Sequence, residues 1–567
     1  MGRPLPPRVI RSGAYVPSMP RTGDDSSTIF RKNNLITVGR AGRYYEEVYR
    51  GEGNYGENLD MVALTGTLEL TMDSTTVTGT GTALFSECHL GQSICAISSD
   101  GLTSWLLKPK QIISDTEMVV WKAPDATATN VTGYRMPRLN ADNVSRQTCL
   151  SGGGMGTDKG NYFGAGSGVV RTNGSPFSTS WTLAKEPSLN LFDPATDTYS
   201  NFPLGMDTPV APTLAAVGGG TKDMQGGSYS LVITPARKET GGYNNPSPRA
   251  DVTIATGDKV RITFPAMDTA NGQNAWGVWV TPYRATLGAD LQYLEGPWFY
   301  YTTVTDTDVS PAGGTFDIEW LDAEVVVNEL VSFNNDPPTD AEGVANLNNI
   351  PVWWGCQGQG NSTNPTQTNR GPFLCPAKPT NVEAAPLELS FSSSPPEIIL
   401  WVVSAQGRLY LLTANHLQIA QSTPDPAVPI LIRPYWKDGF AGPDQLVFVN
   451  GNLYGYPMAG PSRSVGEGDE IEAERDWAAD VSEITKHWNP GHVTVGYDPS
   501  RDMVVFIHSA DHRNDAGFWT SRMLGFGISQ GFWVLDRLMT DNTRDQIVSG
   551  IATVADHLEL LVGGRTA

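Results

Sequence analysis

The chain has 567 residues, 17% of them charged, and a formal net charge of −21 at pH 7. So acidic a chain is a poor candidate for holding nucleic acid, because basic side chains supply most of that affinity, although acidity of this size is also typical of a chain that is simply kept soluble. Its 60 Gly and 40 Pro favour strands and turns over helices, and its length predicts three or four domains.

The five cysteines form no C-x-x-C pair, which favours reduced thiols in a protein assembled in the cytoplasm; they are Cys88, Cys95, Cys149, Cys356 and Cys375. The sequence contains no run of 18 apolar residues, so it predicts no membrane helix. The first residues, MGRPLPPRVIRSG, lack the apolar segment of a signal peptide.

Residues 1–60 are rich in Pro, Arg and Gly, and we interpret them as an extended arm that lies on other surfaces or as a loose terminus. Residues 61–138 predict a small β module, because Leu68, Leu70 and Met72 alternate with polar residues. Its STTVTGTGTALF string resembles a small β-barrel module of phage structural proteins. We therefore expect this module to be a structural accessory.

Residues 139–205 are rich in Gly, Ser and Asn and predict an irregular connector. Lys159 is followed by Gly160, which does not match a phosphate-binding P-loop.

Residues 206–325 predict a β-sandwich of seven short strands. Its Tyr-x-Leu-x-Ile strand, the Asn-Pro-Ser-Pro that follows and a later Tyr-Arg resemble the fibronectin type III-like domains inserted in phage tail proteins. We expect its aromatic residues, Trp276, Trp279, Tyr283 and Tyr293, to belong to the core or a strand face, with carbohydrate binding as the alternative.

Residues 340–567 predict a meander of short strands. Apolar runs of three to six residues recur between turn residues, a pattern of strands and not of helices. Asn450-Gly451 is the strongest hairpin signal, since a type I′ turn needs positive φ at both central residues. Trp353 and Trp354 are adjacent and should point to opposite faces of a strand. Such meanders often close into barrels or propeller blades.

One acidic segment interrupts this meander. It contains five carboxylates before a short helix expected at 480–488, with Asp480 as its N-cap and Glu483 three residues later; the five are Glu467, Asp469, Glu470, Glu472 and Glu474. Such a run is usually a solvated loop. It is also our candidate for a surface that DNA passes without binding, because like charges repel.

The meander carries a family resemblance through the segments EIILWVVSAQGRLYLLT, LVFVNGNLYGYP, DWAADVSEITKHW, MVVFIHS and GFGISQGFWVLDRL. In order and spacing these resemble tail nozzle and head–tail stabilisation proteins of short-tailed bacteriophages, whose cores are β-propellers. The resemblance spans roughly residues 340–560. It implies a virion protein with six copies around the tail axis, contacts with the portal or adaptor and with other tail or fibre proteins, and a channel through which genomic DNA leaves without specific binding.

Other functions stay open as alternatives. His508, Asp511 and His512 superficially match a zinc motif, but that motif requires a helix and this stretch ends a strand. A host-glycan binding or degrading tail protein is the main alternative, although a glycosidase needs two carboxylates across a cleft, which a sequence alone does not reveal. An extracellular adhesion protein is the third. The expectation is therefore a mainly β structural protein of a phage tail, without catalytic residues, cofactor or metal.

Overall fold

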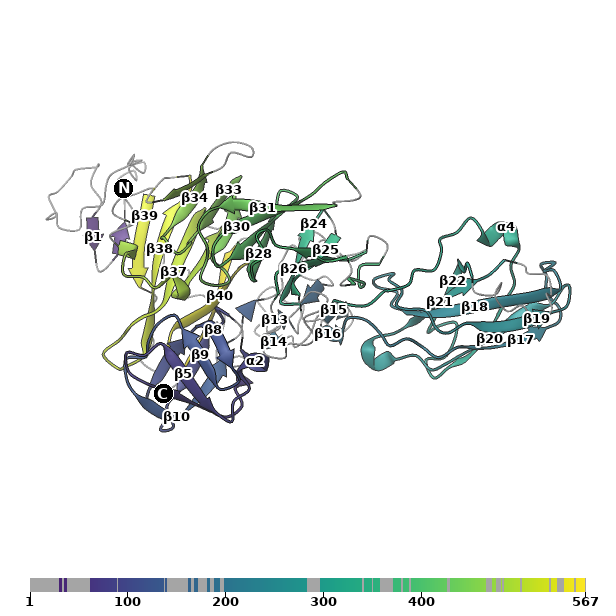
Figure 1. Ribbon diagram of the computed structural model, residues 1–567, viewed down its shortest axis with the longest axis horizontal. Coiled ribbons are helices and arrows are strands. Elements are labelled where there is room, and N and C mark those ends of the chain that lie inside the picture. Colours follow the sequence, from purple (N-terminus) through teal and green to yellow (C-terminus); the bar gives the residue numbers. More distant parts are fainter. Residues whose placement is uncertain are drawn as a thin grey trace, which may run out of the picture.

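The computed structural model describes most of the chain from residue 62 onward. The described residues are 30–32, 35–37, 62–88, 90–136, 138–139, 162–164, 168–171, 181–183, 188–193, 198–282, 296–338, 341–348, 350–356, 371–378, 381–386, 389–425, 429–465, 472–475, 481, 484–499, 502–529, 532–537, 545–554 and 557–565. The fold is mainly β. A β-sandwich projects from one end of a larger body, and a small β module lies beneath that body, away from the sandwich (Figure 1).

The small β module is one curled sheet. Its strand order is β7-β6-β10-β4-β5-β9-β8, with β3 also paired to β10. Leu68 and Leu70 are buried in its core, whereas Met72 is 54% exposed because it lies beyond the end of its strand. The elements are β3 (Val62–Ala63), β4 (Thr67–Leu70), β5 (Thr76–Thr80), α2 (Leu84–Glu87), β6 (Ile94–Ile97), β7 (Ser104–Leu107), β8 (Pro109–Ser114), β9 (Glu117–Val120) and β10 (Ala128–Arg135).

The segment expected to be an irregular connector contributes strands instead. They form two three-stranded sheets, β11-β13-β14 and β12-β15-β16. Leu189 shows why, since its side chain is fully buried in a core shared with Trp353 of the body. The Gly-rich string at 152–156 lies outside the described residues. The strands are β11 (Arg138–Leu139), β12 (Tyr162–Gly164), β13 (Gly168–Arg171), β14 (Trp181–Leu183), β15 (Ser188–Asp193) and β16 (Thr198–Pro203).

The projecting domain is a sandwich of two sheets, β17-β20-β23 and β19-β18-β21-β22. Alternate residues of β20 are buried, and Trp276 and Trp320 fill the core between the sheets. Trp279 packs on the other face, while Tyr283 and Tyr293 lie outside the described residues. The elements are β17 (Thr213–Val217), β18 (Gly227–Ala236), β19 (Ala250–Ile254), β20 (Lys259–Phe264), η1 (Thr269–Asn271), β21 (Ala275–Val280), β22 (Phe299–Thr305), β23 (Gly314–Ile318) and α4 (Asp322–Val325).

The body contains four successive four-stranded antiparallel meanders, β24–β27, β28–β31, β32–β35 and β36–β39, followed by the hairpin β40-β41. The last meander is extended by β2 and β1, near the N-terminal end of the chain. The elements of the body are β1 (Phe30–Lys32), β2 (Leu35–Thr37), β24 (Gly343–Leu347), β25 (Ile350–Cys356), β26 (Phe373–Pro376), β27 (Phe391–Ser392), β28 (Ile399–Ala405), β29 (Arg408–Thr413), β30 (Leu417–Ser422), β31 (Ile430–Trp436), β32 (Leu446–Val449), β33 (Asn452–Gly455), β34 (Ser462–Val465), β35 (Glu472–Arg475), η5 (Pro490–His492), β36 (Val493–Asp498), β37 (Met503–Arg513), β38 (Trp519–Gly527), β39 (Phe532–Arg537), β40 (Ile547–Val554) and β41 (His557–Gly563).

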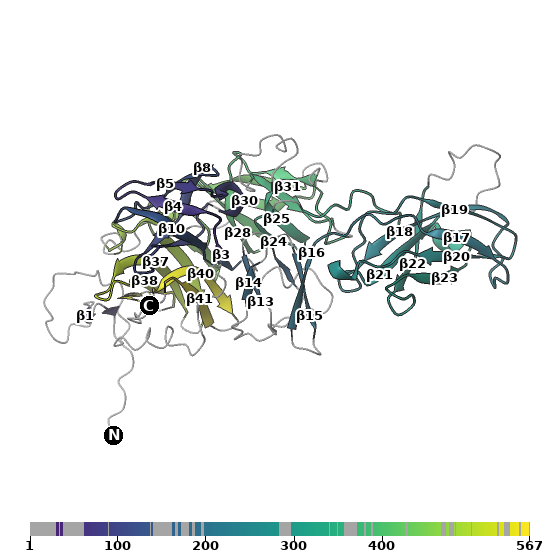
Figure 2. The ribbon, with the colours of Figure 1, turned by 90° about the horizontal axis from the view of Figure 1, so that it is seen from below.

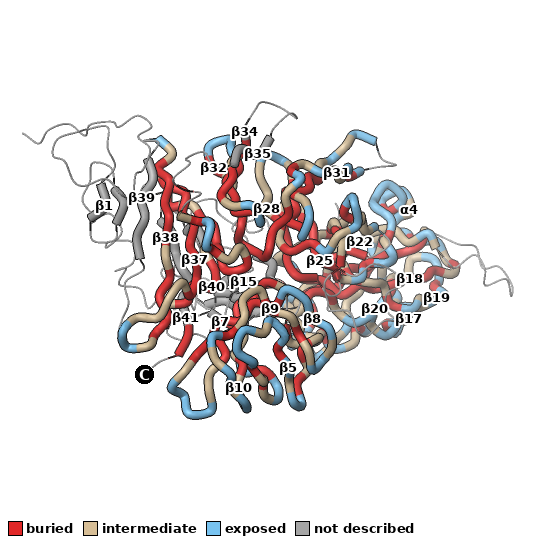
Figure 3. Tube along the Cα trace, turned by 60° about the vertical axis from the view of Figure 1, so that its left-hand side comes forward, coloured by how far each residue is buried: buried red, intermediate tan, exposed pale blue. Residues whose placement is uncertain are grey.

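The meanders are arranged like the blades of a propeller. The first strand of each contacts the first strand of the next, from β24 to β28, β32, β36 and β40, and the connector sheets continue the series through contacts of β11 with β40 and β12 with β24. Buried residues run along β37 and β38, in red in Figure 3, and the view from below separates the body from the sandwich (Figure 2). Such repetition leaves each sheet only short edges.

Local sequence signals explain several of these elements. Asn450 and Gly451 both have positive φ, and Val449 pairs with Asn452, so the expected two-residue hairpin joins β32 to β33. Trp353 and Trp354 are both buried but belong to different cores, as their adjacency in a strand requires. Trp354 meets Trp401 of the next meander edge-on at 5.5 Å between ring centroids.

The sandwich is fixed to the body by a buried polar joint. Arg237 of the sandwich and Glu383 of the body form an ion pair with side chains 0% and 1% exposed. Arg237 also donates from Nη2 to the carbonyl oxygens of Pro203 (2.8 Å) and Asn271 (2.6 Å), and Thr240 Oγ1 donates to Glu383 Oε1 at 2.5 Å. Lys378 Nζ adds a bond to the Phe333 carbonyl oxygen at 2.7 Å.

Candidate functional site

The junction between the small β module and the body is rich in polar contacts between distant parts of the chain. Ser104 Oγ donates to Asp545 Oδ2 at 2.6 Å, and Trp519 Nε1 and Arg513 Nη2 donate to the Ser104 carbonyl oxygen at 2.9 and 2.8 Å. Arg565 donates to the Leu102 carbonyl oxygen. Because these groups are mostly buried, the module is held in one orientation.

A second set of contacts lies at the 3-10 turn η5. Asn489 Nδ2 donates to the Trp121 carbonyl oxygen at 2.7 Å. Gly491 lies directly against the Trp121 ring, and a Cβ at this position would be 2.3 Å from Trp121 Cγ. Glycine is therefore the residue that lets η5 approach the module so closely.

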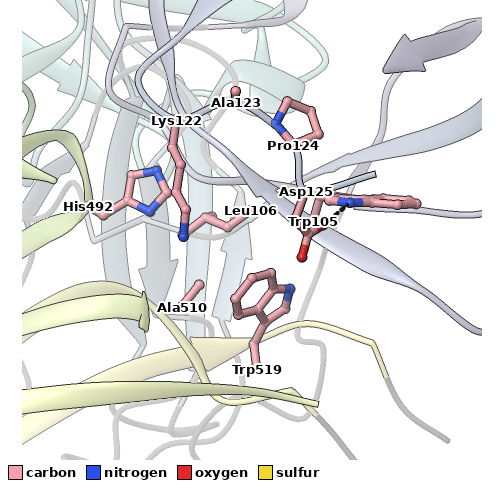
Figure 4. A pocket seen from close by; sticks show the side chains of 9 residues that line it. All are labelled: Trp105, Leu106, Lys122, Ala123, Pro124, Asp125, His492, Ala510 and Trp519. Atoms are coloured by element: carbon pink, nitrogen blue, oxygen red, sulfur yellow. Dashed lines mark hydrogen bonds between the residues drawn. The ribbon is translucent and has the colours of Figure 1, made fainter. Parts of the chain in front are cut away.

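A cavity of about 40 Å³ opens within this junction (Figure 4). Both modules line it, through the residues Trp105, Leu106, Lys122, Ala123, Pro124 and Asp125 on one side and His492, Ala510 and Trp519 on the other. Figure 4 shows the Lys122 ammonium between the His492 imidazole and the Trp519 ring. Lys122 Nζ lies 5.3 Å from the centroid of that ring, close enough for a cation–π contact.

His492 is the unusual residue of the cavity. Its side chain is 1% exposed, and neither ring nitrogen has a hydrogen-bond partner among the described residues. Burial, followed by the charges of Lys108, His508 and Lys122, lowers its pKa well below the ordinary value. The Ser509 backbone lies near enough to oppose this shift but outside hydrogen-bonding geometry.

A histidine–aspartate cluster lies behind His492. His508 Nε2 accepts from the Asn489 backbone N–H at 3.2 Å, so Nδ1 carries the proton that faces Asp511 Oδ1 at 3.1 Å. Asp511 Oδ2 lies 3.2 Å from His512 Nδ1 and 3.4 Å from Arg522 Nε. Burial would raise the pKa of Asp511, but His508 and Arg522 hold it at about 2. Burial likewise lowers the pKa of His508.

The sequence predicted that this stretch leaves a strand for a polar turn after Ile507, but β37 continues through the whole cluster to Arg513. His508 and His512 lie in β37, where the register with β38 shifts between them. The cluster holds one carboxylate between two imidazoles, and no group of three or more His, Cys, Asp or Glu side chains within the described ranges is arranged to hold a metal ion. The arrangement orders the strand end and keeps Asp511 ionised.

The acidic residues proposed from the sequence are placed only in part. Glu472 and Glu474 lie in β35, the outer strand of its meander, where they pair with Val465 and Arg463. Glu467, Asp469 and Glu470 lie outside the described residues, as does Asp480. Val481, Ile484 and Thr485 are helical, within the segment where a short helix was expected.

Four of the five cysteines are described, and all four are buried free thiols: Cys88, Cys95, Cys356 and Cys375. Burial raises the pKa of Cys88 to about 12, so its thiol stays protonated and unreactive. Among the described residues, no helix is long and apolar enough to cross a membrane.

Comparisons with known proteins identify no family. No known protein family and no curated protein matches the sequence. Among solved structures, the chain is similar to the WD40 domain of SCAP from fission yeast, with 10% sequence identity, 83% of this chain and 93% of that chain covered, and a TM-score of 0.15. At this TM-score the two backbones do not superpose as one fold, so the similarity supports no functional argument.

Sequence reasoning did not find the junction cavity. Lys122 and His492 are 370 positions apart in the numbering, and neither belongs to a recognisable motif. The one local signal was the Asn489-Pro490-Gly491-His492 turn, which predicts a tight turn but no partner. The cavity can hold a small polar group; its residues include no nucleophile paired with a base.

Proposed function

We propose that this protein is a structural subunit of a phage tail, in the nozzle or the head–tail stabilising ring, assembled in the host cytoplasm and forming part of a channel for genome ejection. The observation that carries the proposal is mechanical: two accessory β modules are attached to a propeller-like body through buried polar joints. Such joints transmit load and hold domains in fixed orientations, as a subunit of a rigid ring requires.

A strip of exposed apolar side chains on the sandwich supports assembly with other copies. This apolar strip consists of Leu321, Val326, Val327, Leu330 and Phe333, which are 40–78% exposed. Its backbone is fixed to the sheet edge, since Val331 N–H donates to the Trp298 carbonyl oxygen and Tyr300 N–H to that of Glu329. Contiguous exposed apolar residues on a firm support are typical of interaction surfaces.

The charge supports a passive role towards DNA. A wall that binds phosphates through lysines and arginines would retard a passing genome, because each contact releases counterions and adds affinity. The chain has 60 acidic against 39 basic residues, so a surface facing DNA is on average repulsive. Of the five acidic residues that the sequence suggests for such a surface, Glu472 and Glu474 belong to the outer strand β35.

The proposal is tested by the assembly state of the purified chain. We expect mass photometry and electron microscopy to show a closed ring of six copies, and duplex DNA to bind weakly even at low salt. Replacing Val327 and Leu330 by Asp should shift the population toward monomer, whereas the same change at Leu102, which is 71% exposed on the small module, should not. Tight, salt-sensitive DNA binding or a chain that stays monomeric at high concentration contradicts the proposal.

A further inference from the structure

The junction cavity has the properties of a ligand site and not of a packing defect. A gap between apolar side chains would be dry, but this one presents an ammonium, an imidazole and two indole rings. Its volume of about 40 Å³ is on the order of three water-sized spheres. It is partly open to solvent.

The polar groups of the cavity differ in how well they are paired. The Asp125 carboxylate accepts from Trp105 Nε1 at 2.8 Å and from Arg513 Nη2 at 3.3 Å. His492, by contrast, is almost fully buried with both ring nitrogens unpartnered. A buried polar group without a partner is uncommon in a native structure and calls for an occupant.

The surroundings favour an anionic occupant. Lys122 faces the cavity, Arg513 lies over the Trp519 ring at 4.6 Å from its centroid, and the buried Lys108 acts on His492 through its charge. Arg513 already pairs with Asp125, and Asp444 acts on Lys108 through its charge. Water would satisfy the imidazole but leave the Lys122 ammonium without an ionic partner among the described residues. An oxyanion accepts hydrogen bonds from an ammonium and an imidazole together, and charge-assisted bonds of this kind are the stronger ones.

We propose that the junction cavity binds a small tetrahedral oxyanion, of the phosphate or sulfate class, between Lys122 of the small β module and His492 of the body. The anion would bridge the two modules, because one donor comes from each. Its binding would therefore strengthen the docking of the small module. This function is independent of ring assembly, which uses the sandwich at the other end of the molecule.

The experiment uses the full chain and inorganic phosphate, with sulfate in parallel and chloride at matched ionic strength. Phosphate should raise the Tm of wild type by on the order of 2–4 °C at tenfold above its Kd. Lys122→Met keeps the aliphatic stem over Trp519 and should abolish the rise. Lys110→Met is the matched control, because Lys110 lies over Trp121 at 4.9 Å outside the cavity, and it should retain the full rise.

A spectroscopic readout separates the site from a general salt effect. With histidine-selective ¹⁵N labelling, phosphate should raise the pKa of the His492 ring in wild type and leave it unchanged in Lys122→Met. Equal Tm shifts in wild type, Lys122→Met and Lys110→Met would mean general salt stabilisation, and the proposal would be wrong. No response of His492 at tens of millimolar phosphate would mean that the cavity holds water only, which overturns the proposal equally.

Discussion

The buried ion pair between the sandwich and the body provides the sharpest prediction. The change is Glu383→Gln, which keeps the side-chain volume and removes the charge that faces Arg237. Both side chains are at most 1% exposed, so solvent does not screen the change. The guanidinium loses its ionic partner and is unable to neutralise itself by losing a proton.

The magnitude follows from this burial. Removing one partner of a buried pair costs about 3–5 kcal/mol, because the remaining charge is left uncompensated. Arg237 retains its bonds to the carbonyl oxygens of Pro203 and Asn271, which places the expected cost near the lower end, about 3 kcal/mol. Opening of the joint should then be roughly 100-fold more frequent, since 1.4 kcal/mol is a factor of ten.

The opposite substitution, Arg237→Met, should behave differently with pH. Burial already raises the pKa of Glu383, and Arg237 opposes that shift. Without Arg237 the carboxyl escapes its penalty by taking up a proton. A group whose folded pKa is raised contributes stability below its unfolded pKa and loses it as pH rises. Arg237→Met should therefore be milder than Glu383→Gln at pH 5 and become more destabilising toward pH 8.

Hydrogen exchange measures these effects without assuming that the whole chain unfolds in one step. Peptides spanning residues 237–245 and 378–386 should exchange faster in Glu383→Gln, while peptides of β37 should not change. Asp251→Asn is the control, because its pair with Arg249 at 3.5 Å is partly exposed and should contribute about 0.5 kcal/mol or less. Unchanged exchange at the joint in Glu383→Gln would refute the reasoning.

Three further predictions concern the other surfaces. Val327→Asp should lower the ring population in mass photometry without changing the Tm, because the side chain is 78% exposed; a lower Tm with intact rings would contradict an assembly role. Gly491→Ala should loosen the docking of the small β module, since the alanine Cβ would lie 2.3 Å from Trp121. Proteolysis between the modules should then be faster than in the control Gly218→Ala, where the nearest atom to an added Cβ is 3.7 Å away. Equal rates of proteolysis would argue against the contact. Because the pKa of His492 is depressed in the folded state, the contribution of its neutral imidazole to the free energy of unfolding is fully present above about pH 6.5 and is lost progressively as pH falls below that value towards the folded-state pKa. A Tm that falls equally in wild type and His492→Gln between pH 7 and 5 would assign the loss to other groups.

Much of the fold could be predicted because its signals are local. The Asn450-Gly451 turn, the alternation at Leu68 and Leu70, and the adjacent Trp353 and Trp354 each depend on residues within a few positions. The connector strands escaped prediction because their cores are completed elsewhere in the chain. Leu189, for example, is buried in a core that it shares with Trp353, whereas the Gly-, Ser- and Asn-rich composition of residues 139–205 as a whole suggested an irregular connector.

The candidate site could not be predicted either, because the contacts that form it across the junction join residues that are far apart in the sequence. Lys122 and His492 acquire their roles only when two modules dock, and no spacing in the sequence records that contact. Glu383 lies between Val382 and Ala384, but apolar neighbours do not identify a charged partner, and Arg237 looks like a surface residue at the end of a strand. Their pairing reflects tertiary structure alone.

The small β module is synthesised long before the residues on which it docks. The Ser104–Asp545 bond joins residues 441 positions apart, and at about 5–20 residues per second the ribosome needs on the order of 20–90 s to cover that distance. During this interval the module can close its own core, while the docking face around Cys95, Leu106 and Met136 waits for Trp519 and Ile547. A nascent chain paused in this interval therefore exposes an apolar docking surface, which chaperones would be expected to bind until Trp519 and Ile547 have been synthesised.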